Sequence, residues 1–413
     1  MAEAVVAWPT EGFRRVPYRV YHDPAVFACE RQKIFRGPVW NFLALEAELP
    51  DPGDFKTTSI ADIPIVVTRD RDGSLHAFVN RCAHRGSRLC LKSSGKNLQD
   101  LTCVYHAWTY DLRGNLVSAA FRRGLRGEGG LPEDFELREH GLETLRVESF
   151  AGIVFGSFDP ATEPLADYIG AVGPSIRRVM RKPLRVLGYD SMVINGNWKS
   201  YHENNKDTYH ANILHAFFGT FGMSRQSQES RMILDAGGRH MYTYTKRGTE
   251  VDSEDYARTT ANLRSVQSNF KLADPSLLDW IDEFGDGQSV SITTLFPNFV
   301  LHQIQNSLAV RQIIPRSAKQ LEVIFTYFGY RDDPPEMTRM RLKQANGTGS
   351  AGLISMEDFA VCEFVDQGTT GSEDDDAAFL EMGGKELTSG GESKLSERAL
   401  RNFWNVYRTL MDV

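Results

Sequence analysis

Short β-like runs, rich in apolar, β-branched and aromatic residues, dominate the chain from about residue 39 to about residue 155. Such runs are typical of β-strands, and turn-forming stretches such as RDRDGS and DLRGN separate them. Strands are predicted at WNFLALEAEL, FKTTSI, IPIVVTRD, LHAFVN, LTCVYHAWTYD and NLVSAA. The pattern therefore indicates a small antiparallel β domain.

Outside that region, some segments have helical spacing of apolar residues and others have strand-like spacing. Helices are predicted in PAVFACERQKIF, from Trp198 to about Phe218, near MTRMRLKQAN and in SERALRNFWNVYRTLM. Strands are predicted in HMYTYTKRG, across SVSITTLFPNFVLHQIQNSLAVRQIIP and in LEVIFTYFGYRDD. Because strands and helices occur in separate blocks, an α+β domain is favoured over a doubly wound one.

A chain of 413 residues is too long for one ordinary core, so two domains are expected. Residues 1–38 and 155–413 are predicted to form one α+β domain, with an antiparallel sheet flanked by helices. Residues 39–154 are predicted to form an antiparallel β domain inserted into it. The stretch from Gly368 to Lys394 is acidic and rich in Gly and Ser, so a mobile surface loop is expected there.

Composition narrows the class of protein. A hydrophobic fraction of 41% with 24% charged residues is ordinary for a globular enzyme. The net charge of −7 argues against binding to nucleic acid or an anionic membrane. No apolar run is long enough to span a bilayer, and MAEAVVAWPTEGF lacks the features of a signal peptide, so a cytoplasmic location is expected. Five cysteines in a chain of this length do not make a disulfide framework.

Two pairs of metal-binding side chains lie in the β region. One residue separates Cys82 from His84, and two residues separate Cys103 from His106. Two Cys and two His also suit a tetrahedral zinc site, but zinc-binding sequences usually space two like ligands in each pair. In a Rieske [2Fe–2S] centre two Cys hold one iron and two His hold the other, which suits loops that each supply one Cys and one His. The pattern therefore favours a Rieske cluster over zinc.

A second constellation, NWKSYHENNKDTYHANILHAFF, contains Asp207, His210 and His215. Two imidazoles and a distant carboxylate form the facial triad of non-haem Fe(II) oxygenases, and SMEDFAV offers Glu357 or Asp358 as the carboxylate. Asp207 and His210 are three apart and are expected on one face of a helix. His210 and His215 are five apart, about 140° around an ideal helix, so a distortion is expected between them. The alternative, two hydrogen-bonded histidines on a helix, is disfavoured by the Rieske motif beside it.

These segments resemble a known family. NRCAHRGSRLC, CVYHAWTYDLRGNL, ENNKDTYHANILH and SMEDFAV look like the motifs of the large subunits of aromatic-ring-hydroxylating Rieske non-haem iron oxygenases. The resemblance covers almost the whole chain. It implies that Cys82 and Cys103 bind the inner iron of the cluster, and that His84 and His106 bind the outer one. It also implies that the α+β domain is catalytic.

The same resemblance implies roles around the mononuclear iron. His210, His215 and Asp358 correspond to its ligands. Asp207 corresponds to a residue that connects this iron with the Rieske cluster of a neighbouring subunit. Second-shell carboxylates also orient ligand imidazoles, so this role is physically reasonable. Two further residues are predicted beside the site, with packing as their alternative role: Asn204 and Tyr209.

Within the family, the resemblance is closest to terephthalate dioxygenases and to the group of salicylate hydroxylases and anthranilate dioxygenases. Arg311 matches an arginine that binds substrate carboxylate in the terephthalate enzymes. Lys394 is the best match for their second arginine, and it keeps the charge but loses the bidentate fork. A solvated lysine is the alternative interpretation. Period-two alternation puts Arg311 on the face opposite Val300 and Ile304, either in a pocket or in solvent.

The implied reaction uses O2 and two electrons to form a cis-dihydrodiol, or a phenol in the hydroxylase members. Electrons from NADH are expected through a separate reductase, with or without a ferredoxin. Trimers, with or without a small β subunit, are also implied. The basic loop FRRGLRGEGGLP is either a solvated excursion or a docking surface for a redox partner.

Two other functions stay open at this stage. A Rieske electron-transfer protein needs only the first motif, which would leave the second one unexplained. A Rieske oxygenase for a neutral or an N- or O-methyl substrate needs both motifs but no cation in the pocket.

Overall fold

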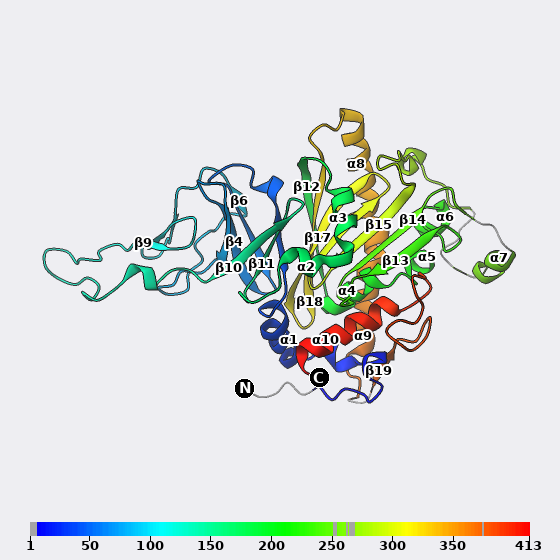
Figure 1. The fold of residues 1–413 in the computed structure, drawn as a ribbon, viewed down its shortest axis with the longest axis horizontal. Coiled ribbons are helices and arrows are strands. Elements are labelled where there is room, and N and C mark those ends of the chain that lie inside the picture. The colour runs from blue at the N-terminus through cyan, green and yellow to red at the C-terminus, as the bar shows by residue number, and fades with distance from the viewer. Residues whose placement is uncertain (1–5, 251–253, 262, 264–268, 374–375) are drawn as a thin grey trace. The chain divides into compact units, whose positions relative to one another are not determined.

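A computed structural model describes residues 6–250, 254–261, 263, 269–373 and 376–413. The chain forms two compact units, one of residues 35–165 and one of residues 1–34 with 166–413 (Figure 1). Both contain antiparallel sheets, and the second also contains most of the helices, so the predicted α+β class is confirmed. The domain boundaries at 39 and 154 fall inside the first of these units and stay predictions.

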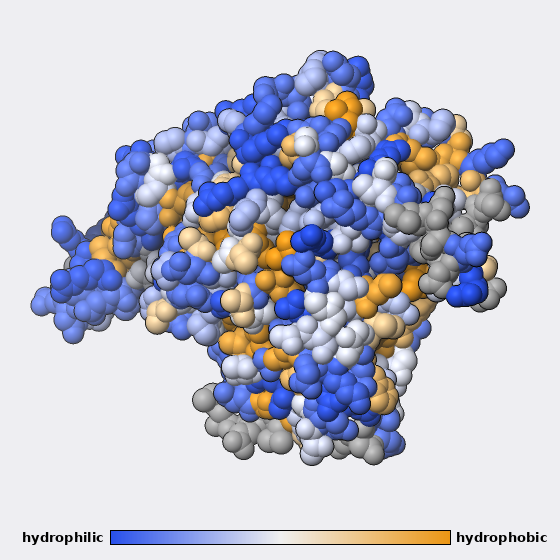
Figure 2. Space-filling view, turned by 45° about the vertical axis from the view of Figure 1, so that its right-hand side comes forward, coloured by the Kyte–Doolittle hydropathy of each residue, from blue (hydrophilic) through white to orange (hydrophobic). Residues whose placement is uncertain are grey.

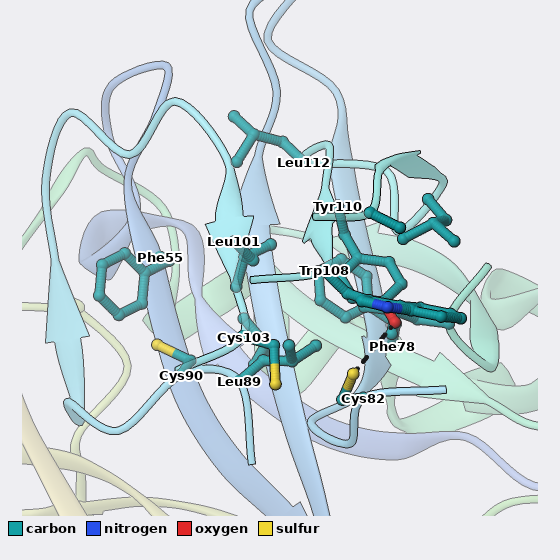
Figure 3. Packing of buried hydrophobic residues seen from close by; sticks show 14 residues of the cluster. Phe55, Phe78, Cys82, Leu89, Cys90, Leu101, Cys103, Trp108, Tyr110 and Leu112 are labelled. Atoms are coloured by element: carbon teal, nitrogen blue, oxygen red, sulfur yellow. Dashed lines mark hydrogen bonds between the residues drawn. The ribbon is translucent and has the colours of Figure 1, made fainter. Parts of the chain in front are cut away.

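The unit of residues 35–165 is built on short antiparallel strands, as the short β-like runs and the turn signals between them predict. A seven-stranded sheet has the order β2 (Asn41–Leu45), β11 (Ile153–Ser157), β10 (Thr144–Phe150), β5 (Leu75–Val79), β4 (Ile63–Arg69), β3 (Phe55–Ile60) and β6 (Ser94–Gly95). A three-stranded sheet consists of β7 (Leu101–Thr102), β8 (Thr109–Tyr110) and β9 (Leu116–Ser118). Figure 3 shows the apolar cluster between them, which includes Phe55, Phe78, Trp108 and Tyr110.

A second seven-stranded antiparallel sheet is the centre of the other unit. Its order is β12 (Leu184–Ile194), β18 (Gln320–Tyr330), β17 (Ser307–Ser317), β16 (Phe299–Ile304), β15 (Gln288–Leu295), β14 (Met241–Lys246) and β13 (Ser230–Leu234). From β15 to β18 the strands follow one another as hairpins, and most of their side chains are buried. Strands buried on both faces lose the clean alternation that strand prediction depends on.

Two of the helices of this unit begin at residues whose side chains cap them. Asp23 accepts a hydrogen bond from the Ala25 N–H at the start of α1, and Asn197 accepts one from Lys199 at the start of α4. The helices are α1 (Pro24–Glu30), α2 (Leu165–Ile169), α3 (Gly173–Val179), α4 (Trp198–Lys206), α5 (Ala211–Leu214), α6 (Ala216–Phe221), α7 (Glu254–Thr260), α8 (Pro335–Thr348), α9 (Leu353–Thr369) and α10 (Arg398–Met411). A π-helical segment, residues 31–35, follows α1.

The expectation of a mobile surface loop between Gly368 and Lys394 is wrong for its described part. Strand β19 (Ala377–Phe379) pairs with β1 (Arg15–Pro17), and Lys394 is buried. The cause is Arg401 of α10, whose fully buried guanidinium donates to four carbonyl oxygens of this stretch. These carbonyls belong to Leu380, Met382, Glu386 and Ser389. The acidic, glycine-rich composition therefore does not indicate mobility here, because hydrogen bonds from Arg401 hold the loop.

None of the described helices is long and apolar enough to cross a membrane. Hydrophilic residues cover most of the face of the molecule shown in Figure 2, and apolar residues form smaller patches between them.

Candidate active site

The helical stretch predicted from Trp198 to Phe218 is broken into three short helices. Helix α4 ends at Lys206, and Asp207 has φ −78° and ψ 98°, outside the helical region. His215 also leaves the helical region between α5 and α6, with φ −82° and ψ 97°. The distortion predicted between His210 and His215 is therefore confirmed.

The prediction that Asp207 and His210 share one helical face is wrong. Asp207 ends α4, whereas His210 lies at the start of α5. The side chain of Asp207 accepts a hydrogen bond of 2.9 Å from the N–H of Tyr209. A local bond of this kind gives the backbone an alternative to the helix.

The two breaks bring together three side chains that could bind a metal ion. Atoms of His210, His215 and Asp358 all lie within 4.8 Å of one another. The Nε2 atoms of His210 and His215 lie 3.5 Å and 3.2 Å from Oδ1 of Asp358. Asp358 projects from α9, so residues far apart in sequence form one site. Two imidazoles and one carboxylate that converge in this way could hold a ferrous ion.

Neighbouring side chains orient these three groups. Asn204 Nδ2 donates to Asp358 Oδ1 over 3.0 Å, as expected for a residue beside the site. Glu357 Oε2 lies 2.8 Å from Nδ1 of His215, on the nitrogen that faces away from Asp358. Glu357, the rival carboxylate, therefore occupies the position of a group that orients an imidazole. The side chain of Tyr209 is not among the described residues that line the pocket.

The electrostatic potential of the site suits a cation. Burial acts to lower the pKa of His210, but Asp207 and Asp358 outweigh it and raise that pKa to about 10. Burial also opposes the positive charge of His215, and Asp358 nevertheless raises the pKa of its imidazole. In the opposite direction, the two histidines hold the pKa of Asp358 well below its usual range although burial acts to raise it. The carboxylates of Asp207 and Asp358 thus favour positive charge at the imidazoles where the three side chains meet.

A pocket opens beside the three side chains and has both apolar and cationic walls. Arg311 and Lys394 both line it, so neither predicted substrate residue is lost to solvent. The solvated interpretation of Lys394 is therefore wrong. The remaining lining residues are Asn204, Asn205, Asp207, Thr208, His210, Ala211, His215, Phe218, Ser224, Thr243, Tyr244, Thr245, Val290, Ile292, Ile304, Ile354 and Asp358.

Arg311 lies on a different face from the one that alternation predicts. The segment is a hairpin: β16 turns at Gln305 and Asn306 into β17, and Gln305 has a left-handed φ of 54°. The turn pairs Val300 with Arg311 and Ile304 with Ser307. Residues directly opposite each other in an antiparallel pair point to the same face. Arg311 therefore shares a face with Val300 and Ile304, because counting through the turn inverts the parity.

The two cations are held differently. The guanidinium of Arg311, 2% exposed, donates to His302, Tyr201 and Asn205 and has no carboxylate partner among the described residues. Lys394 Nζ donates to Thr245 Oγ1 over 2.8 Å and lies 3.4 Å from Ser224 Oγ. Burial lowers the pKa of Lys394 to about 8. Sequence reasoning missed these partners, although Tyr201 and Asn205 lie four apart on α4.

The cysteines and histidines of the first motif lie on two loops of the same form. The Gly86 N–H donates to Cys82 O, and the Ala107 N–H donates to Cys103 O, each over 2.9 Å. Gly86 and Ala107, each four residues after its Cys, both have positive φ. The two cysteines are buried and free, and Figure 3 shows them at the edge of the apolar cluster.

The donor set at these loops fits a Rieske cluster. The Nδ1 atoms of His84 and His106 lie 3.1 Å apart, and His84 is exposed. Burial acts to raise the pKa of the Cys103 thiol, but the N–H groups of Tyr105 and His106 offset this and lower it. Two buried thiols and two outward imidazoles match an inner iron with thiolate ligands and an outer iron with histidine ligands.

Fold and site together define a large subunit of the Rieske, mononuclear-iron oxygenase class. Residues 39–126 match the model of the Rieske [2Fe-2S] domain, and residues 182–413 match the model of the ring-hydroxylating alpha subunit (catalytic domain). The chain belongs to the family of ring-hydroxylating dioxygenase large subunits. Such chains use a Rieske cluster, a mononuclear iron and O2, with electrons from NADH through a reductase. This excludes the alternatives of structural zinc and a simple Rieske electron carrier.

Relatives agree with this family, and a solved structure has the same fold. The chain is 46% identical to the terminal oxygenase component subunit alpha 2 of terephthalate 1,2-dioxygenase from Comamonas sp, over 100% of this chain and 98% of the relative. It is 45% identical to the anthranilate 1,2-dioxygenase large subunit of Burkholderia cepacia, over 98% and 95%. The fold matches naphthalene 1,2-dioxygenase from Rhodococcus sp. with a TM-score of 0.77 at 24% identity, over 96% and 94% of the two chains.

Proposed function

We propose that this chain hydroxylates an aromatic carboxylic acid, with terephthalate as the first candidate and a cis-dihydrodiol as the product. The observation that carries this proposal is a buried arginine without a carboxylate partner among the described residues, in the pocket beside His210, His215 and Asp358. A buried charge is costly unless it is paired. A carboxylate of the substrate would supply the missing partner through charge-assisted hydrogen bonds.

The other walls of the pocket support an aromatic substrate. Val290, Ile292, Ile304 and Ile354 are apolar, and Phe218 adds a ring. Apolar walls with a small number of fixed polar groups are typical of sites that bind and orient small molecules. Such a pocket would bury the ring of the substrate while its carboxylate lies at the cation.

Lys394 favours a dicarboxylate. A second buried cation in the same pocket, also without a described acidic partner, suits an acid with a carboxylate at each end. The anthranilate and salicylate alternatives carry one carboxylate and leave Lys394 without an anion. Relatives named for terephthalate and anthranilate are almost equally similar to this chain, so their names do not decide between the two.

We assign the metal ligands from the geometry above. Cys82, His84, Cys103 and His106 would hold the Rieske cluster, which would supply electrons, and the mononuclear iron would activate O2. His210, His215 and Asp358 would hold that iron. Asp207, 3.5 Å from Nδ1 of His210, would connect it electronically with the cluster of a neighbouring subunit.

The partners are proposed from the family to which the chain belongs. We expect a trimer, α3 or α3β3 with a small β subunit, that receives electrons from a reductase or a ferredoxin. The basic loop FRRGLRGEGGLP supports docking of an acidic redox protein, because Arg122, Arg123 and Arg126 are exposed. Phe121 and Leu131 of the loop line a depression together with His84 and His106.

The test is substrate preference in Arg311 variants. Losing one partner of a buried charged pair costs about 3–5 kcal/mol, or roughly two to four orders of magnitude in affinity. We expect Arg311→Ala to lower kcat/KM for terephthalate by at least a hundredfold, measured by oxygen uptake with a reductase, and to affect the diamide far less. Arg316→Ala is the matched control, since Arg316 lies on the same strand but is exposed and pairs with Glu322. Equal losses for acid and amide would refute carboxylate recognition by Arg311.

A further inference from the structure

The guanidinium of Arg311 is fixed on three sides. Its Nε donates to Nδ1 of His302 over 3.0 Å. Its Nη1 donates to Tyr201 OH over 3.3 Å and to Asn205 Oδ1 over 3.2 Å. The ring of Phe325 lies against its face, with the guanidinium carbon 5.1 Å from the ring centroid. Nη2 has no hydrogen bond to any described residue, so it is the part of the group left for a ligand.

The sheet register produces this arrangement. Arg311 lies opposite Val300 on β16 and opposite Phe325 on β18. Successive side chains alternate between faces, so His302, two residues after Val300, points to the same face as Arg311. His302 is therefore a diagonal neighbour of Arg311 and Phe325 a direct one, which puts one at the edge and the other at the face of the guanidinium.

The bond to Arg311 determines the tautomer of His302. Arginine is always a donor, so Nδ1 must accept and the ring proton must lie on Nε2. His302 is fully buried, and burial, with the charge of Arg311, lowers its pKa well below the usual value, so the ring is neutral. Nε2 has no hydrogen-bond partner among the described residues. An unpaired buried N–H is unfavourable, so His302 is a poor choice for packing alone.

We propose that His302 is a positioning residue for substrate recognition. As a neutral imidazole it holds Nε of Arg311, so the guanidinium cannot turn its Nε edge toward the pocket and meets the substrate carboxylate through Nη2. The inference rests on the proposed function, because it assumes that Arg311 binds a carboxylate. Carboxylate recognition would then also depend on Nδ1 of His302, an acceptor atom that does not itself contact the substrate.

The experiment compares three substitutions of His302 with Arg311→Ala. In His302→Asn, the amide oxygen lies close to the former position of Nδ1 and can still accept from Arg311. In His302→Gln the oxygen lies one atom further out, and in His302→Leu no acceptor remains. Each variant is purified with its iron content and cluster absorbance measured. KM and kcat are then determined for terephthalate and for its diamide.

We expect His302→Leu and His302→Gln to raise KM for terephthalate at least tenfold, with kcat and the KM for the diamide within threefold of wild type. His302→Asn should return the acid KM to within threefold. Equal changes for acid and diamide, or equal behaviour of Asn and Gln, would overturn the inference. If the Leu variant does not fold, the Asn and Gln pair still makes the comparison. If Arg311→Ala itself fails to separate acid from diamide, the proposed function is wrong instead.

Discussion

The protonation of Lys394 gives a quantitative test of dicarboxylate recognition. Burial lowers the pKa of this lysine to about 8 from an ordinary value of 10.5. The difference corresponds to about 3 kcal/mol against the charged form. Burial is the only cause of the shift, and no charged group of the described residues contributes to it. An anion that offsets the penalty therefore has to come from the ligand.

The pH dependence follows because only protonated Lys394 attracts a carboxylate. With a pKa of about 8, roughly nine-tenths of the free enzyme carries this proton at pH 7 and roughly one-tenth at pH 9. Apparent affinity falls in proportion to the competent fraction. KM for terephthalate should therefore rise about tenfold from pH 7 to pH 9. KM for benzoate, whose one carboxylate would lie at Arg311, should not show this rise.

Two variants isolate the effect in oxygen-uptake assays with excess reductase at each pH. Lys394→Arg keeps its charge above pH 9, so its KM for terephthalate should stay flat across the range. Lys394→Met lacks the charge, so its KM should be high and equally flat. A wild-type KM ratio of terephthalate to benzoate that does not change between pH 7 and pH 9 would refute the reasoning. A KM ratio of terephthalate to benzoate in Lys394→Met that equals the wild-type ratio at pH 7 would also refute it.

The pH dependence of the free energy of unfolding provides a second test of the lowered pKa of Lys394. Between pH 8 and pH 10.5 the unfolded chain binds more protons at Lys394 than the folded chain does, because the folded pKa is lower. The free energy of unfolding contributed by this site therefore rises with pH across that window. Below pH 8 the buried charge is a full penalty. Without substrate, Lys394→Met should consequently melt at a higher temperature than wild type at pH 7, and the difference should shrink by pH 10.

Two further predictions concern the metal sites. Asp358→Ala should lose mononuclear iron and activity but keep the cluster absorbance, because the two ligand sets are separate; loss of the cluster spectrum in a folded variant would contradict the assignment. Asp207→Asn should keep most of both metals yet slow the oxidation of the cluster in a single turnover of pre-reduced enzyme. Cluster oxidation at the wild-type rate in that variant would show that Asp207 only ends α4.

Much of the fold can be predicted from the sequence, because local patterns decide it. Turn-forming stretches separate the short strands of the inserted region, and the capped helices α1 and α4 begin near the predicted residues. The stretch from Gly368 to Lys394 could not be predicted, since the group that orders it is Arg401 on a different element. Local composition cannot predict order that depends on hydrogen bonds from a residue on another element.

For the site, the sequence predicts which residues are candidates but not how their side chains are arranged. Residue types and spacing identify His210, His215 and Asp358 as candidates, because few other patterns combine these donors beside a Rieske motif. Spacing alone cannot say which carboxylate of SMEDFAV faces the histidines. The structure separates them: Asp358 Oδ1 lies near both Nε2 atoms, whereas Glu357 contacts the far nitrogen of His215.

Two departures from regular backbone explain why periodicity could not predict this site. An unbroken helix would direct His210 and His215 about 140° apart, so both can face one carboxylate only because the chain leaves the helix at His215. The turn at Gln305 likewise reverses which face Arg311 occupies. Regular helices and strands hold the side chains rigidly, but in this site the side chains converge only because the helix ends at His215 and the strand turns at Gln305. The residues at these interruptions therefore determine the site as much as the residues that bind.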